Sequence, residues 1–166
     1  MPAGTYAVTV NVGIAEGKGT AYFDGIQLEE GTVPSAYNLM DNPSFERGDL
    51  ADLHGWVAIP SVSSSNTLAN TAHSGSRGYM IKGTPTSTPC IRQTVPVNCD
   101  NKSVFKVSGW MKAEALPVKD VENEGQRELN LQICINYVGG ATTWYNFPFN
   151  PYVSGWQYVS GIIDCD

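Results

Sequence analysis

The sequence is poor in charge and contains no long apolar run. Only 16% of its 166 residues are charged and 42% are hydrophobic, which is typical of a globular chain and excludes a disordered one. No segment reaches the roughly 18 apolar residues that a membrane-spanning helix needs. No charged and apolar leader opens the chain, so an exported parent protein would carry its export signal elsewhere.

Basic residues are also scarce. The chain has 10 Lys and Arg against 16 Asp and Glu, which gives a formal net charge of −6. Nucleic acids and anionic membranes attract basic surfaces. We therefore expect neither nucleic acid nor membrane as a partner, and cations or neutral ligands remain open.

Helical patterns are missing, whereas short alternating segments are frequent. Turns rich in Gly, Asn, Pro and Ser separate these segments, and the chain has 17 Gly and 10 Pro. This pattern predicts an all-β fold, an antiparallel β-sandwich or jelly roll. The expected strands are 5–14, 19–28, 38–46, 54–60, 76–83, 90–97, 103–113, 128–137, 142–149 and 155–163.

Neither cysteine nor histidine forms a metal-binding motif. The four Cys include no C-x-x-C pair and only two His are present, so we do not expect zinc. Cys90 and Cys99 bracket one extended segment, and if that segment is a single strand their α-carbons lie too far apart for a disulfide. We expect free thiols, with Cys165 available to pair between chains.

Motifs for catalysis are absent as well. The sequence has no G-x-S-x-G elbow, no P-loop, and no G-x-G-x-x-G between a strand and a helix. Its acidic residues cluster at turns, where solvation explains them, and do not form the opposed pair of a glycosidase. An enzyme is therefore not expected.

Five segments occur in an order that resembles a known family. They are NLMDNPSFERGD…GW from residue 38, AHSGSRGYMI from 72, IRQTVPV from 91, FKVSGWMKA from 105 and GWQYVSGII from 155. The order is similar to that of the jelly-roll carbohydrate-binding modules of families four, nine and twenty-two (galactose-binding-like). The string AYFDGIQLEEGTVPSAYNL also resembles junctions between tandem modules in large Gram-positive surface proteins, some with YD (RHS-type) repeats. The resemblance implies an extracellular or cell-surface location.

The same resemblance suggests how the chain is divided. Residues 1–28 resemble the last two strands of a preceding or permuted module, 29–37 form a connector, and 38–166 resemble a module that lacks its own last two strands. We expect the N-terminal pair, read as a hairpin, to dock into its own chain and close a circularly permuted sandwich. A monomer is favoured, and a domain-swapped dimer is the alternative.

The resemblance further implies a structural calcium site. In the family, the Glu of the Phe-Glu motif and an Asp of the last strand are ligands, and Glu46 and Asp24 occupy those positions here. Carbonyl oxygens would come from around Ser44, His73 and Ser76, a donor set that suits a hard cation. Gly25 stands where the family often has a second Asp. The alternative is that both carboxylates lie on the surface without metal.

Exposed aromatics suggest a sugar-binding surface, because sugars bind aromatic faces ringed by polar groups. Trp110 lies on the polar face of its strand, and Trp144 and Tyr145 point to opposite faces, whereas Trp56 and Trp156 are expected in the core. Should the strands adjoin, Trp110 would stand above an amide row formed by Asn130, Gln132 and Asn136. We therefore predict a non-catalytic carbohydrate-binding module with a glycan partner. The alternatives are aromatics packed between the sheets and a ligand-free spacer or adhesion module.

Overall fold

The structure is a computed structural model that describes residues 3–15, 19–33, 37–49, 52–59, 66–84, 86–97, 99, 103–114, 128–150 and 153–165. Within these ranges the chain forms ten β-strands and no helix. The described residues therefore include no helix that could cross a membrane. The strands are β1 (Ala3–Ala15), β2 (Gly19–Glu30), β3 (Val57–Ile59), β4 (Asn66–Ala69), β5 (Gly78–Gly83), β6 (Cys90–Pro96), β7 (Val104–Glu114), β8 (Glu128–Val138), β9 (Thr142–Pro148) and β10 (Gln157–Asp164).

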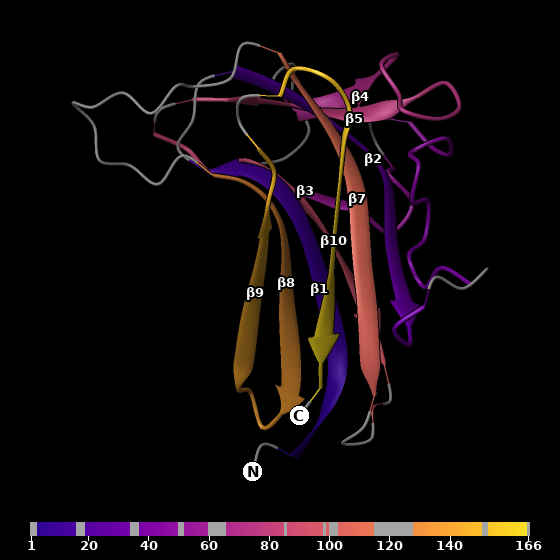
Figure 1. Ribbon diagram of the computed structural model, residues 1–166, viewed down its shortest axis with the longest axis vertical. Helices are drawn as coiled ribbons and strands as arrows, with labels where there is room; N and C mark the ends of the chain where they lie inside the picture. The colour runs from indigo at the N-terminus through magenta and orange to yellow at the C-terminus, as the bar shows by residue number, and fades with distance from the viewer. Residues whose placement is uncertain are drawn as a thin grey trace.

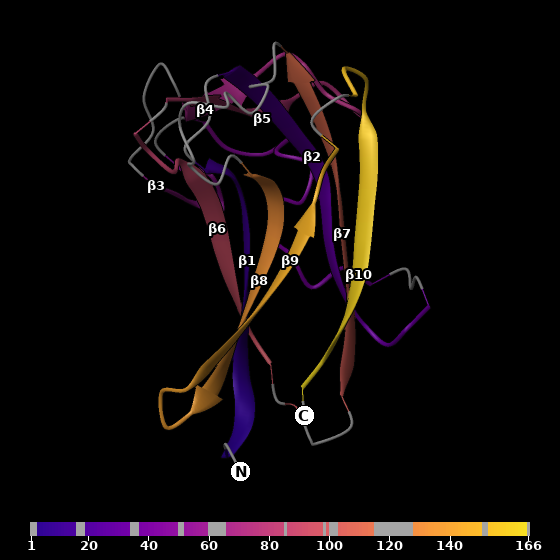
Figure 2. The same ribbon diagram turned by 60° about the vertical axis from the view of Figure 1, so that its left-hand side comes forward.

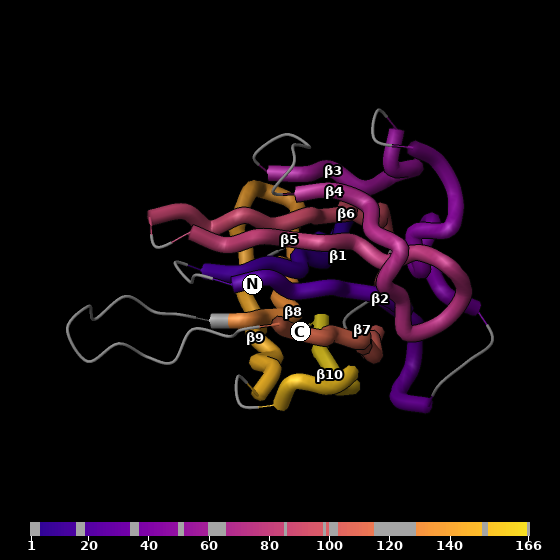
Figure 3. The backbone as a smooth tube through the Cα atoms, turned by 90° about the horizontal axis from the view of Figure 1, so that it is seen from above, coloured from indigo at the N-terminus to yellow at the C-terminus, as the bar shows by residue number. Residues whose placement is uncertain are grey.

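The strands form two antiparallel sheets of five strands each. The first sheet has the order β3-β6-β1-β8-β9 and the second has the order β10-β7-β2-β5-β4. Figures 1 and 2 show the long strands of the two sheets side by side. In the view from above, β1 and β2 lie in the middle, with β3 and β4 toward one side and β9 and β10 toward the other (Figure 3). The predicted all-β antiparallel sandwich is confirmed.

The first two strands lie in different sheets. β1 pairs with β6 and β8, whereas β2 pairs with β5 and β7. The expected hairpin is therefore not formed, because each strand finds its partners far away in the sequence and buries its apolar face in the shared core. Both strands nevertheless complete sheets of their own chain, as the permuted closure requires. The proposed division at 29–37 stays a prediction, and residues 34–36 lie outside the described part.

The core fills the space between the sheets and follows the predicted alternation. Its members include Phe105, Val107 and Met111 of β7 and Leu129, Leu131, Ile133 and Ile135 of β8, all buried. Tyr6 departs from the alternation of β1: it stands two positions before the buried Val8, yet 53% of its surface is exposed. The pairing of β1 with β8 shifts register between Thr5 and Ala7, and this irregularity turns Tyr6 outward.

Candidate functional site

The segment 38–46, expected as a strand, instead contains a turn at residues 42–47, and Phe45 anchors this turn in the core. This side chain is fully buried and packs on the rings of Trp56 and Tyr79, at centroid distances of 5.3 and 5.6 Å. The side chain of Asn42 closes the turn, because it accepts from the backbone N–H of Arg47 and donates to the carbonyl of the same residue. The predicted core position of Trp56 is confirmed.

Glu46 follows this buried anchor and binds the loop at residues 73–77. One carboxylate oxygen accepts from the backbone N–H groups of Ser76 and Arg77, at 2.7 and 2.8 Å. The other accepts from the hydroxyl of Ser76 at 2.6 Å. The Ser76 hydroxyl and the Arg77 N–H hold the pKa of Glu46 below its usual value. Gly75 has φ +71°, and a Cβ there would collide with the Glu46 carboxylate.

Asp24 binds the same loop at residues 73 and 74. It lies at a register irregularity of β2, where Gly25 has φ +58°. One oxygen of its fully buried carboxylate accepts from the backbone N–H groups of His73 and Ser74, both at 2.8 Å, and the other accepts from the N–H of Gly25. Burial raises the pKa of Asp24 above its usual value, against the opposing effect of these donors. Asp24 and Glu46 together fix the position of the loop.

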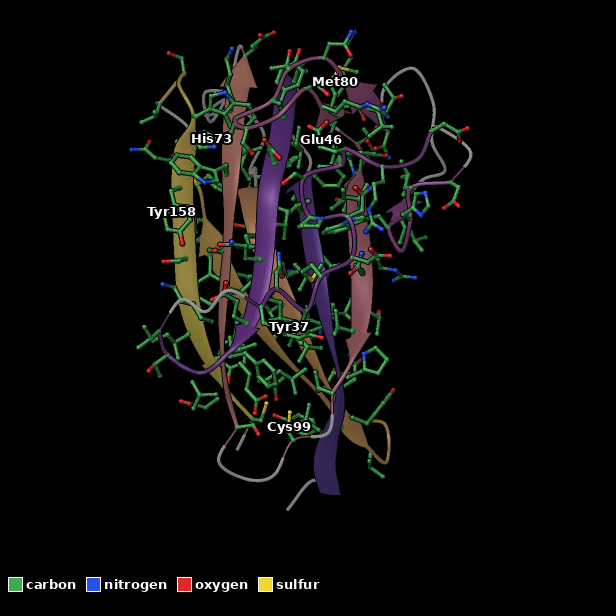
Figure 4. The ribbon with its side chains drawn as sticks, turned by 90° about the vertical axis from the view of Figure 1, so that its right-hand side faces the viewer. Tyr37, Glu46, His73, Met80, Cys99 and Tyr158 are labelled. Atoms are coloured by element: carbon green, nitrogen blue, oxygen red, sulfur yellow. The ribbon has the colours of Figure 1, made fainter. Side chains whose placement is uncertain are left out.

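Four aromatic side chains meet at this loop. The ring of His73 stacks on Trp110, with centroids 3.7 Å apart and planes at 11°. Trp110 also contacts Tyr158, and His73 meets Trp156 at 74°. We call His73, Trp110, Trp156 and Tyr158 the aromatic platform. His73 is exposed, as is 45% of Tyr158, so the platform faces solvent. Figure 4 shows His73, Tyr158 and Glu46 toward the same end of the molecule.

The structure brings most of the predicted calcium ligands to this loop. Asp24, Glu46, His73 and Ser76 meet there, and Ser44 lies in the turn that carries Glu46. The loop, however, directs N–H groups rather than carbonyl oxygens at the two carboxylates. No cluster of three or more His, Cys, Asp or Glu suited to a metal occurs in the described ranges. Calcium binding stays a prediction.

The residues predicted to bind sugar are divided between the two sheets. Trp110 lies in β7 of the second sheet, whereas the amides of β8 and the aromatics of β9 lie in the first. Trp144 is 53% exposed, and Tyr145 is partly buried against the core. The amides of β8 form hydrogen bonds with neighbouring strands. Gln132 donates to the side chain of Asn146, and Asn136 donates to the Thr9 hydroxyl and to the carbonyl of Ala7. Asn130 and Gln132 line a small pocket. Trp110 therefore does not stand above the amide row.

Sequence reasoning missed part of the platform. Trp156 is half-buried and is not in the core as predicted, because its ring packs beside His73. Tyr158 pairs with Trp110 across β10 and β7, and its alternation with Val159 was the available signal. The role of the His73 ring could not be read from the sequence, because it depends on where the loop docks.

Comparison with known proteins gives one group of relatives. The chain is 25% identical over 158 residues to "tRNA nuclease WapA" of Bacillus subtilis (strain 168) and 28% identical over 155 residues to "tRNA3(Ser)-specific nuclease WapA" of Bacillus spizizenii. It is also 25% identical over 158 residues to "tRNA(Glu)-specific nuclease WapA" of Bacillus subtilis subsp. natto. Each match covers 89% of this chain, which spans only 6% of the length of these curated relatives. No protein-family model and no solved structure matches.

These relatives correct the functional predictions from the sequence. Proteins named tRNA nucleases contradict the assignment to carbohydrate-binding modules, the glycan partner, and the alternative of a ligand-free spacer or adhesion module. They also contradict the exclusion of an enzyme and of nucleic acid. The physical reason is that net charge averages the whole surface, and an acidic average does not prevent bases from stacking on local aromatics. The extracellular or cell-surface location stays a prediction.

Proposed function

We propose that this chain is a β-sandwich module of a larger protein that cleaves tRNA, and that the module contacts unpaired tRNA bases through its aromatic platform. The observation that carries the proposal is the similarity, over 89% of the chain, to three proteins that are all named tRNA nucleases. Because the chain spans 6% of their length, their activity is assigned to the larger protein and not to a residue of this module.

The geometry of the platform suits nucleobases. Single-stranded RNA is commonly bound by stacking its bases on aromatic side chains, which is worth about 1–3 kcal/mol per base. His73 and Trp110 already form a stack of two flat rings, and Tyr158 extends the aromatic surface along the neighbouring strand. The loop below is held by two carboxylates, so the surface is ordered before a base arrives. Pre-ordering lowers the entropy lost on binding.

Charge limits which parts of tRNA this surface binds. The chain carries a net charge of −6, and the carboxylates of Asp24 and Glu46 accept hydrogen bonds from the loop at residues 73–77 that carries His73. Lys112 stands two positions after Trp110 on the same face of β7. Its Nζ lies 3.9 Å from Oε1 of Glu114, so its charge is paired with a carboxylate. A duplex bound through its phosphates is therefore disfavoured. We assign the platform to unpaired bases in a loop or at the 3′ end, where stacking dominates.

Binding by the module is tested with fluorescein-labelled RNA and fluorescence anisotropy. We expect saturable binding of a single-stranded oligoribonucleotide of about eight nucleotides, much weaker binding of a duplex, and a shallow dependence on salt. His73→Ala should weaken binding about 5- to 100-fold, which corresponds to the loss of one stacking contact. Trp144→Ala is the matched control, because Trp144 is an exposed aromatic on the other sheet.

Cleavage is tested separately with the complete protein. We expect it to convert tRNA into discrete fragments, and we expect His73→Ala in the complete protein to raise KM more than it lowers kcat. A complete protein that leaves tRNA intact would contradict the assigned activity. Cleavage that is unaffected by His73→Ala would contradict the role of the platform while leaving the activity of the larger protein standing.

A further inference from the structure

Two cysteines meet at the end of the molecule away from the platform. The sulfur atoms of Cys99 and Cys165 lie 3.5 Å apart, although the residues are 66 positions apart in the sequence. Cys99 lies between β6 and β7, and Cys165 directly follows β10. In Figure 4, Cys99 lies far from His73, so this pair is separate from the site described above.

The backbone at Cys165 is already held in place. The N–H of Cys165 donates to the carbonyl of Ser103 at 3.2 Å, which joins the end of β10 to the segment that leads into β7. All four thiols are free in this structure. A disulfide has an S–S length of about 2.05 Å, so the two sulfur atoms need to approach by only about 1.5 Å.

We propose that Cys99 and Cys165 form a reversible intramolecular disulfide that locks the last strand to the β6–β7 connection. The other two cysteines provide an internal contrast. Cys90 lies at the start of β6, and Cys134 is buried in β8, where its thiol contacts a backbone carbonyl and Asn136. Neither has a sulfur partner among the described contacts. The proposal does not depend on the proposed function.

A small disulfide such as oxidised glutathione supplies the oxidising equivalents. The thiolate of Cys99 attacks one of its sulfurs and releases one molecule of the small thiol, which leaves a mixed disulfide on Cys99. The thiolate of Cys165 then attacks the Cys99 sulfur and releases the second molecule. Two protein thiols thus lose two protons and two electrons, and one small disulfide becomes two thiols.

Access favours Cys99 as the first nucleophile. It lines a cleft of about 300 Å³ together with Glu30 and Phe105, whereas Cys165 is only 6% exposed. Burial and the adjacent Cys165 raise the pKa of Cys99 to about 12, so little thiolate is present at neutral pH. We expect the oxidation rate to rise about tenfold per pH unit between about pH 7 and pH 9.

Locking should stabilise the fold, because it closes a long loop and fixes β10 at the edge of its sheet. The closed loop lowers the entropy of the unfolded chain, and the melting temperature should rise by roughly 5–15 °C. A reductant should reverse the rise.

The test compares the chain kept in reductant with the chain kept in excess oxidised glutathione. We expect the number of titratable thiols per chain to fall from four to two. Non-reducing peptide mapping should show one disulfide-linked pair of peptides, which contain Cys99 and Cys165. Cys99→Ser and Cys165→Ser should each abolish the rise in melting temperature, whereas Cys134→Ser should retain it. Four free thiols after prolonged oxidation at alkaline pH, a different cross-linked pair, or a disulfide-linked dimer would overturn the proposal.

Discussion

The imidazole of His73 lies flat against the indole of Trp110, with ring centroids 3.7 Å apart and planes at 11°. This stack depends on a third residue, Asp24. Asp24 accepts from the backbone N–H groups of His73 and Ser74, and it is paired with Trp110 in the β2–β7 register. One buried carboxylate thus places the loop that carries His73 over the strand that carries Trp110.

Removing this carboxylate should loosen both the fold and the stack. Asp24→Ala leaves the N–H groups of His73 and Ser74 without their acceptor, and we expect a loss of about 2–4 kcal/mol in the free energy of unfolding. Asp164→Ala, at an exposed carboxylate of β10, should cost less than about 0.5 kcal/mol. Urea denaturation measures both values, and equal losses would show that Asp24 does not anchor the loop.

Glu46 should make the stability of the fold depend on pH in acid. Its pKa is lowered by folding, so its contribution is fully present above its ordinary value of 4.5 and is lost as the pH falls through the folded value. We expect the difference in unfolding free energy between the wild type and Glu46→Gln to shrink from about pH 6 to about pH 3. A difference that stays constant over this range would contradict the hydrogen bonds assigned to Glu46. The raised pKa of Asp24 acts with the opposite sign, and the comparison cancels it because Asp24 is present in both proteins.

The calcium prediction has a direct thermal test. One oxygen of each carboxylate accepts a single hydrogen bond, from Gly25 to Asp24 and from the Ser76 hydroxyl to Glu46, and so retains capacity for a cation. If calcium binds, the melting temperature in calcium at about 100 times its Kd should exceed that in chelator by roughly 5–10 °C. Glu46→Gln should remove the difference. An unchanged midpoint in the wild type would count against the ion.

The positions of β1 and β2 predict a monomer. Each strand is the central strand of its sheet and is flanked on both sides by strands of the same chain, so neither place is left for a strand of a second copy. Light scattering after size-exclusion chromatography should give a mass near 17.9 kDa at micromolar concentration. A stable dimer of about twice that mass would instead support exchange of the N-terminal strands between copies.

Local patterns in the sequence predicted the faces of the strands, whereas pairings over long sequence distances escaped prediction. The alternation in β7 and β8 correctly separated buried Val107 and Leu131 from outward Trp110 and Gln132. The same reasoning failed for the N-terminal pair, because a short turn between two strands does not decide whether they pair or enter different sheets. The prediction that Trp110 stands above the amides of β8 was wrong for the same reason, because β7 and β8 lie in different sheets.

The candidate site was only partly visible in the sequence. The motifs placed Asp24 and Glu46 at one loop, and the structure brings them there, but they contact its N–H groups. The side chain of His73 gained its role only through the docking of the loop onto β7. The net charge of −6 led to the wrong exclusion of nucleic acid as a partner, because net charge gives no information about four aromatic side chains gathered on one surface.

Anisotropy titration of a labelled single-stranded oligoribonucleotide with the wild type, His73→Ala and Trp144→Ala tests the central claim most directly. The proposed contact predicts saturable binding that His73→Ala weakens about 5- to 100-fold and that Trp144→Ala changes by less than about twofold. No saturable binding by the wild type, or equal affinity of the wild type and His73→Ala, would contradict it.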